Sequence, residues 1–163
     1  MTVSENTKKM IGFSEGNLHD INHFLKVYAY AKTIGECEGL DPQTQAILEA
    51  AAIVHDIACP LCRKKYGSTN GKYQELEGGP LTVDFLKDSG LSPAFIDRVA
   101  WLVAHHHTLT NVDGPDHQIL LEADYLVNAE ESNYPPENIR HALNVLFKTP
   151  TGCALLRSVY GIS

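Results

Sequence analysis

Apolar residues recur along nearly the whole chain at spacings of three or four, which is the period of an amphipathic helix. This pattern predicts a first helix over residues 17–37. A second helix is expected to begin at Asp41-Pro42, where an N-cap residue precedes a proline at the first helical position. It carries an apolar face to residues 55–56, and Pro60 is expected to end it because proline cannot continue a helix.

The rest of the chain contains further helical segments and one long stretch that is rich in glycine. Four glycines between residues 63 and 79 predict a long loop, and such loops in compact domains are often functional. No segment shows the alternation typical of a strand, so the pattern predicts an all-α fold. Helices are expected near 80–89, 92–107, 118–131, 138–147 and from 150 onward, with a turn at 111–115.

Length and composition fit one ordinary globular domain spanning residues 1–163, with 44% apolar and 20% charged residues. No apolar run approaches the ~20 residues needed to cross a bilayer, and the polar first ten residues lack a secretory signal. Four cysteines are too few for a disulfide scaffold, which favours the reducing cytoplasm. A net charge of −7 argues against binding to nucleic acid polymers or anionic membranes.

Local charge is more informative than the total, because one short segment is purely basic. Arg63, Lys64, Lys65 and Lys72 occupy ten positions that contain no acid. A basic, glycine-containing segment on an acidic protein could receive a small anion. The alternative is an ordinary solvated surface loop.

Four residues with metal-ligating side chains fall near the core-facing sides of three predicted helices: His23, His55, Asp56 and Asp124. A carboxylate on an apolar face is unfavourable unless it is paired or bound to a metal. Imidazole together with carboxylate suits divalent Mn, Fe, Co, Ni or Zn better than an all-oxygen calcium site. Each residue alone is more often a hydrogen-bonded core residue than a ligand, so the argument depends on the set.

The ordered set His23, His55-Asp56 and Asp124 resembles the HD superfamily of metal-dependent phosphohydrolases. The surroundings at residues 22–27, 50–57 and 122–126 are also similar, although Lys26 stands where arginine is common. The resemblance covers about residues 17–131, with 132–163 as a helical extension. It implies a single compact bundle with at least five core helices, in which these four residues hold one metal ion.

Many relatives hold a second metal ion, and the resemblance implies where its ligands would lie. Glu75 occupies a position that is commonly histidine, and a carboxylate can also ligate; the alternative is an exposed loop acid. Among the histidines 105–107, His106 continues the apolar face of its helix and His107 borders it, whereas His105 is less central. A histidine triplet is also often a solvated helix end.

Two other groups of residues receive a structural interpretation. Cys59 and Cys62 form a C-x-x-C pair, but no second pair or βαβ pattern accompanies it, so we interpret it as local variation rather than a redox or zinc site. His19 and His141 have no partner that the sequence identifies, and surface exposure or core packing is expected for both.

The resemblance implies hydrolysis of a phosphate ester of a small molecule, with a nucleotide as the expected substrate, by metal-activated water. Magnesium is a further candidate metal. The expected catalytic residues are Asp56, Glu75, His106 and His107. The expected substrate-binding residues are Lys26, Lys64, Lys65 and Lys72. The protein is expected to be a monomer or homodimer, and two alternatives stay open: an HD-type di-iron oxygenase and a non-catalytic metal-binding regulatory module.

Overall fold

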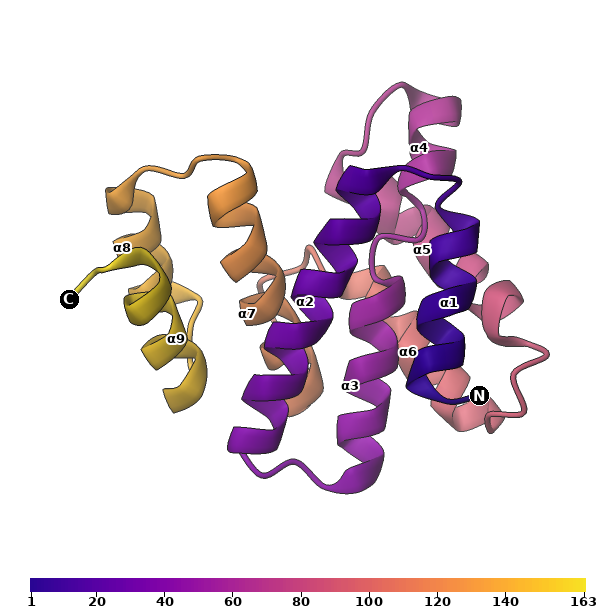
Figure 1. The fold of residues 1–163 in the computed structure, drawn as a ribbon, viewed down its shortest axis with the longest axis horizontal. Helices are drawn as coiled ribbons and strands as arrows, with labels where there is room; N and C mark the ends of the chain where they lie inside the picture. The colour runs from indigo at the N-terminus through magenta and orange to yellow at the C-terminus, as the bar shows by residue number, and fades with distance from the viewer.

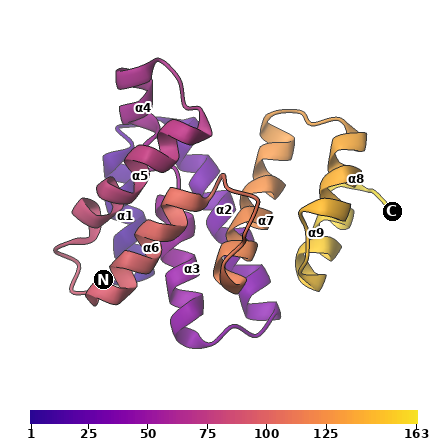
Figure 2. The same cartoon turned by 180° about the vertical axis from the view of Figure 1, so that it is seen from behind.

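Nine α-helices and no strand make up the protein in this computed structural model, which describes residues 1–163 (Figures 1 and 2). This architecture confirms the all-α prediction. The helices are α1 (Val3–Phe13), α2 (Leu18–Cys37), α3 (Pro42–Val54), α4 (Cys59–Tyr66), α5 (Gly71–Leu86), α6 (Pro93–His105), α7 (Gly114–Glu131), α8 (Pro136–Val145) and α9 (Pro150–Tyr160).

Side-chain N-caps fix several helix starts where the sequence predicts them. Asp41 accepts hydrogen bonds from the backbone amides of the first turn of α3, and Pro42 follows it as the first helical residue. Ser92 and Thr149 cap α6 and α9 in the same way. Each cap satisfies amide groups that have no partner within the helix, which is why these residue types set helix starts. The prediction for α7 is less accurate, because that helix begins at Gly114 rather than near residue 118.

The hydrophobic core is centred on α3, which contacts α1, α2, α6 and α7 (Figure 1). Every residue from Ile47 to Val54 is buried, so this helix has no solvent-facing side along its second half. The segment Pro42–Tyr66 is long and apolar enough to cross a membrane by length and composition, but 72% of its apolar window is buried inside the fold. Its hydropathy therefore reflects its position as the central core segment.

The prediction of a long loop at residues 63–79 is wrong, because α4 and α5 occupy most of it. Gly67 does end α4, with the positive φ of 63° that favours glycine after a helix. Gly78, however, lies inside α5, where a Cβ atom would stand 2.7 Å from Cγ1 of Val103 on α6. Glycine here permits close approach of two helices and does not break one.

The roles that the sequence predicts for two prolines are also wrong. Pro60 does not end the second helix, which stops at Val54; it lies in the first turn of α4, where proline is tolerated. Pro80 does not begin a helix, because it lies within α5. The helix expected at 80–89 is therefore the second half of a longer one.

The first helix, α1, is absent from the sequence-based prediction and covers one side of the core. Thr2 and Glu5 form a reciprocal capping box at its start. Met10 is buried and α1 contacts α3. Because α1 is mostly polar, its apolar contact with the core cannot be recognised from the sequence alone.

The C-terminal helices α8 and α9 lie beside α7, at the left in Figure 1, and a buried carboxylate ties them to it. Glu122 on α7 is fully buried. Its Oε1 accepts hydrogen bonds from the backbone amides of Lys148 and Thr149 at 2.7 and 3.0 Å, and its Oε2 accepts one from Oγ1 of Thr149 at 2.5 Å. These bonds compensate the burial of the charge and position the α8–α9 segment against α7.

Candidate metal centre

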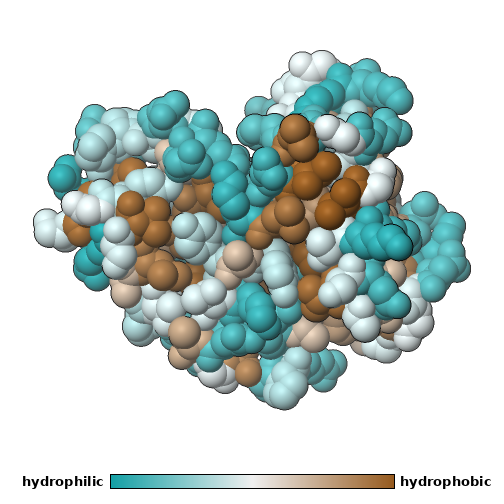
Figure 3. All heavy atoms as spheres, viewed as in Figure 1, coloured by the Kyte–Doolittle hydropathy of each residue, from teal (hydrophilic) through white to brown (hydrophobic).

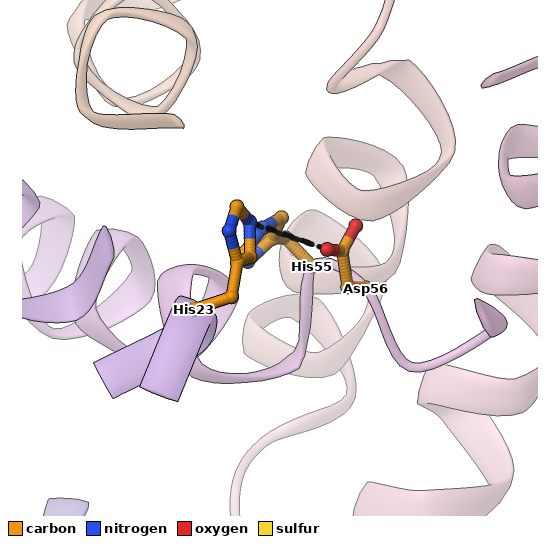
Figure 4. A group of neighbouring side chains, drawn as sticks. All are labelled: His23, His55 and Asp56. Atoms are coloured by element: carbon orange, nitrogen blue, oxygen red, sulfur yellow. Dashed lines mark hydrogen bonds and ion pairs between the residues drawn. The ribbon is translucent and has the colours of Figure 1, made fainter. Parts of the chain in front are cut away.

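The four residues singled out as metal ligands come together in the fold. His23 projects from α2, His55 and Asp56 lie in the turn after α3, and Asp124 projects from α7. Figure 4 shows the His23 and His55 rings beside the Asp56 carboxylate. His23, His55 and Asp56 each offer one ligand atom within 4.8 Å of the others.

The ligand atoms of this group are crowded against one another. Nε2 of His23 lies 3.1 Å from Nε2 of His55 and 3.3 Å from Oδ2 of Asp56. Oδ1 of Asp124 lies 3.1 Å from Nε2 of His23 and 3.5 Å from Nε2 of His55. Four electron-pair donors from three parts of the chain therefore face a common point.

The other nitrogen of each ring is already used, which fixes the tautomers. Nδ1 of His55 donates to the backbone oxygen of Ala52 at 2.8 Å, and Nδ1 of His23 donates to Oε2 of Glu131 at 2.8 Å. Both acceptors lack hydrogen, so both Nδ1 atoms carry one, and Nε2 is the nitrogen of each ring that faces the centre and can bind a metal. This is the usual way in which proteins orient metal-ligating histidines.

The donor set fits a divalent transition metal. Two imidazole nitrogens 3.1 Å apart with carboxylate oxygens beside them suit a shared cation, which is a proton on His23 in the metal-free protein and a divalent ion in its place when metal binds. Nitrogen with oxygen ligands suits Mn, Fe, Co, Ni or Zn. His106 adds an independent sign, because its Nε2 is buried and makes no hydrogen bond while its Nδ1 donates to the Val103 carbonyl at 2.7 Å.

The residues of the centre shift one another's pKa values. Burial alone would lower the pKa of His23, but the hydrogen bond to Asp124 and the nearby charge of Asp56 outweigh it and raise the pKa to about 9. Burial would raise the pKa of Asp124, but hydrogen bonds from His23 and His55 hold it well below its usual range. Burial would likewise raise the pKa of Asp56, but the nearby His55 and the contact with His106 lower it, so both aspartates are ionised at neutral pH, as ligands must be.

A second group of potential ligands adjoins the first and shares Asp56. Asp56, His106 and His107 also offer ligand atoms within 4.8 Å of one another. Oδ2 of Asp56 faces His23, whereas Oδ1 lies 3.4 Å from Nε2 of His106. The two oxygens of one carboxylate thus point to two neighbouring positions, so the site offers donors for two metal ions. His105 belongs to neither group, and its ring instead stacks on Trp101 with the ring centres 4.0 Å apart.

Glu75 lies beside this second group but outside it. Its Oε1 accepts hydrogen bonds from the backbone amide of His107 at 3.1 Å and from Oγ1 of Thr108 at 2.7 Å. The carboxylate therefore holds the chain just after α6, where His106 and His107 lie. Its expected roles as a ligand or catalytic residue stay predictions.

The four expected substrate-binding lysines lie outside the pockets that open onto the centre. Lys65 pairs with Glu77 at 2.5 Å, and Lys26 pairs with Glu131 at 2.9 Å. Nζ of Lys72 lies 4.8 Å from the centre of the Tyr73 ring, and Lys64 lines a separate pocket on the α1 side. The basic segment therefore directs only Arg63 toward the centre.

A polar pocket of about 170 Å³ opens onto the centre between α2, α4 and α7. The surface is hollowed between these helices at the top of Figure 3, and hydrophilic side chains border the hollow. Arg63 is the one lysine or arginine in its lining, and Asp20 holds the guanidinium through two hydrogen bonds of 2.7 Å. Cys59 also lines this pocket, while Cys62 is fully buried, and both thiols are free.

Sequence reasoning missed two residues of α7 that support the centre. Nδ2 of Asn128 donates to Oδ1 of Asp124 at 2.9 Å, and Glu131 holds the His23 ring. Both follow Asp124 on one helical face, at the fourth and seventh positions after it. That spacing is the signal that could have identified them.

Fold and site together define an all-helical protein with a buried histidine–aspartate centre that could hold one or two metal ions. The chain belongs to the HD domain family, which matches residues 20–129. All four expected ligands lie within this range.

A crystal structure described as a predicted HD superfamily hydrolase from an uncultured Thermotogales bacterium has a similar fold. The TM-score is 0.72 at 22% sequence identity, and the similarity covers 97% of this chain and 84% of the other. It therefore includes the C-terminal helices that lie beyond the matched HD domain. Among curated proteins, none matches this chain.

Proposed function

We propose that the protein is a metal-dependent phosphohydrolase that cleaves a phosphate ester of a small molecule, with a nucleotide as the substrate class. The observation that carries this proposal is the convergence of two histidine Nε2 atoms and two ionised carboxylates at one buried point. A divalent cation held there supplies Lewis acidity toward the phosphoryl oxygen and lowers the pKa of water.

The chain's own residues would orient the reaction around this point. Asp56 reaches both ligand groups with its two oxygens, so it sets the distance between them. His107 lines both pockets that open onto the centre and is exposed, which places it to contact a bound ester or the attacking water. Glu75 keeps that segment in place through the His107 amide.

Arg63 is the side chain that we assign to the phosphate charge. It is the one lysine or arginine lining the polar pocket, and its two bonds to Asp20 leave it 42% exposed and pre-oriented. Guanidinium groups suit phosphate oxygens because their planar donors match that geometry. The four free cysteines support a reducing, cytoplasmic location, and a small phosphorylated molecule is the expected partner.

A panel of phosphate esters tests the proposal. The purified protein is loaded with Mn, Co, Ni, Zn, Fe or Mg in turn and assayed for released phosphate with and without oxygen. We expect metal-dependent release that persists under anaerobic conditions and that is lost in His55→Ala. Oxygen consumption with iron and no phosphate release with any metal would instead support a di-iron oxygenase. Metal binding with neither activity would support a regulatory module.

A further inference from the structure

A second, larger pocket opens onto the same centre from the side of α8. It has a volume of about 500 Å³ and shares His107, Asp124 and Asn128 with the polar pocket. We call it the α8 pocket. A molecule anchored at the metal centre would reach it without crossing bulk solvent, because His106 and Asp124 form part of its wall.

The walls of the α8 pocket are mainly apolar and aromatic and come largely from the C-terminal part of the chain. No lysine or arginine lines it, and Asp124 is its one acid. The apolar lining includes Tyr125, Tyr134, Ala142, Val145 and Leu146. Val145 lines the pocket and is 55% exposed, so we take it to mark the pocket's opening to solvent. The chemistry of this wall suits an uncharged organic group.

Three polar groups in the lining are accessible to solvent: the side-chain amide of Asn138 and the ring of His141 are exposed, and Tyr134 is half-buried. The hydroxyl of Tyr125 donates to the Asn138 backbone oxygen at 3.2 Å. A pure hydrocarbon would cover these groups without replacing their bonds to water, which is unfavourable. A ligand with flat apolar faces and polar edges would satisfy both kinds of wall.

We propose that the α8 pocket binds the neutral, ring-bearing organic group of a phosphate monoester, of the size and polarity of a nucleoside, while its single phosphate lies at the metal centre. The part that concerns the phosphate rests on the proposed function. Aromatic faces at Tyr125 and Tyr134 offer stacking surfaces, and their ring centres lie 5.5 Å apart. The side chains of Asn138 and His141 then form hydrogen bonds with the polar edge of the ring.

The charge distribution favours one phosphate over three. Additional phosphates would lie either along the α8 pocket, which has no lysine or arginine, or in the polar pocket, whose one arginine already pairs with Asp20. A triphosphate brings several negative charges, and no lysine or arginine beyond Arg63 lines either pocket to balance them. The substrate class is therefore a nucleoside monophosphate rather than a nucleoside triphosphate.

Binding of nucleosides, which carry no phosphate, tests the pocket without requiring activity. The metal-loaded protein is labelled with nitrogen-15 and titrated with adenosine, guanosine, cytidine and thymidine to about 10 mM, a range that detects weak binding. We expect saturable shifts of backbone amides in residues 134–146 for at least one nucleoside. Val145→Arg, which fills the pocket mouth, should abolish them. Val159→Arg is the matched control, because Val159 is 45% exposed on α9 and lies outside the pocket.

Kinetics tests the specificity assignment on the same helix. Nucleoside monophosphates are compared with glycerol phosphate, which lacks the ring. Asn138→Ala and His141→Ala should each lower the ratio of the two kcat/KM values about threefold to tenfold, as expected for one lost hydrogen bond. Asn144→Ala, an exposed asparagine of α8 outside the pocket, should leave the ratio unchanged.

The outcomes separate the two proposals. Nucleoside shifts at 134–146 without hydrolysis of any ester would support the α8 pocket and overturn the phosphohydrolase. Hydrolysis without these shifts, with ratios unmoved by Asn138→Ala, would support the phosphohydrolase and overturn the pocket. Triphosphates with a higher kcat/KM than monophosphates would overturn the single-phosphate assignment.

Discussion

Nδ1 of His23 donates a hydrogen bond to Oε2 of Glu131 at 2.8 Å, across the contact between α2 and α7. The other oxygen of Glu131 is bound by Nζ of Lys26 at 2.9 Å. Burial would raise the pKa of Glu131, but these two partners lower it, so the carboxylate stays ionised. A charged acceptor at Nδ1 keeps a hydrogen there, so Nε2, which faces the metal centre, is the nitrogen that gives up its proton when a metal binds.

Glu131→Ala should weaken metal binding about 10- to 100-fold, the range known for partners that orient a ligating histidine. Glu130→Ala is the matched control, because Glu130 also contacts Lys26 but is 69% exposed and does not touch His23. Competition with a chromogenic chelator measures both affinities. Equal affinities for the two variants would mean that Glu131 does not orient the ligand.

The metal-free protein should lose stability as pH rises from about 6.5 to 9. The pKa of His23 is raised to about 9, above the unfolded value of 6.5, so its stabilising effect is complete below pH 6.5 and is lost as pH rises through 9. The loss should be on the order of 3 kcal/mol. Urea unfolding with EDTA measures it, and His23→Gln should flatten the profile. A flat wild-type profile would show that the protonated ring is not held by the aspartates.

Gly78→Ala should destabilise the protein by about 1–3 kcal/mol, because the added methyl group would stand 2.7 Å from Cγ1 of the stiff side chain of Val103. Gly12→Ala is the matched control on α1, where nothing lies within 4 Å of the added atom. That change should stabilise by about 0.4–1 kcal/mol. Urea unfolding compares the two, and equal effects would contradict the close packing of α5 on α6.

Arg63→Ala should raise KM for a phosphate monoester, and the effect should be larger at low ionic strength than at high. Lys64→Ala is the matched control on the next residue, which lines a different pocket. KM measured against salt concentration compares the two. A larger effect of Lys64→Ala on KM would indicate that the lysines of the basic segment, rather than Arg63, bind the phosphate.

Much of the fold can be predicted from this sequence because local signals fix it. The starts of α2, α3, α6 and α9 follow from a capping side chain, alone or with a proline at the first helical position, and those interactions lie within one turn. The errors occur where a contact between residues far apart in the sequence determines the secondary structure. Gly78 suits a helix only because α6 lies against it, and the sequence of α5 does not contain that information.

The residues of the candidate site likewise divide into those that local signals predict and those that depend on distant contacts. His23 and Asp124 are found because each is a polar residue at an inward position of a helix, and His55 and Asp56 because they directly follow the apolar face of α3. The basic segment predicts the wrong substrate-binding residues because charge alone does not show which way a side chain points. Lys65 is satisfied by Glu77, whereas Arg63 is turned to the pocket by Asp20, and both pairings join residues more than ten positions apart. The α8 pocket was not predicted because its walls come from α7, α8 and the segments before them.

The most direct test of the account is the metal content of the protein in which His55→Ala and Asp56→Ala are combined. Wild type and variant are purified in the same metal-supplemented medium and analysed by plasma mass spectrometry, with the exposed pair Asp88→Ala and Asp97→Ala as a control. We predict bound transition metal in wild type and control, and almost none in the variant, together with loss of the rise in Tm that metal gives to the wild type. A variant that keeps full metal occupancy while folded would contradict the metal centre.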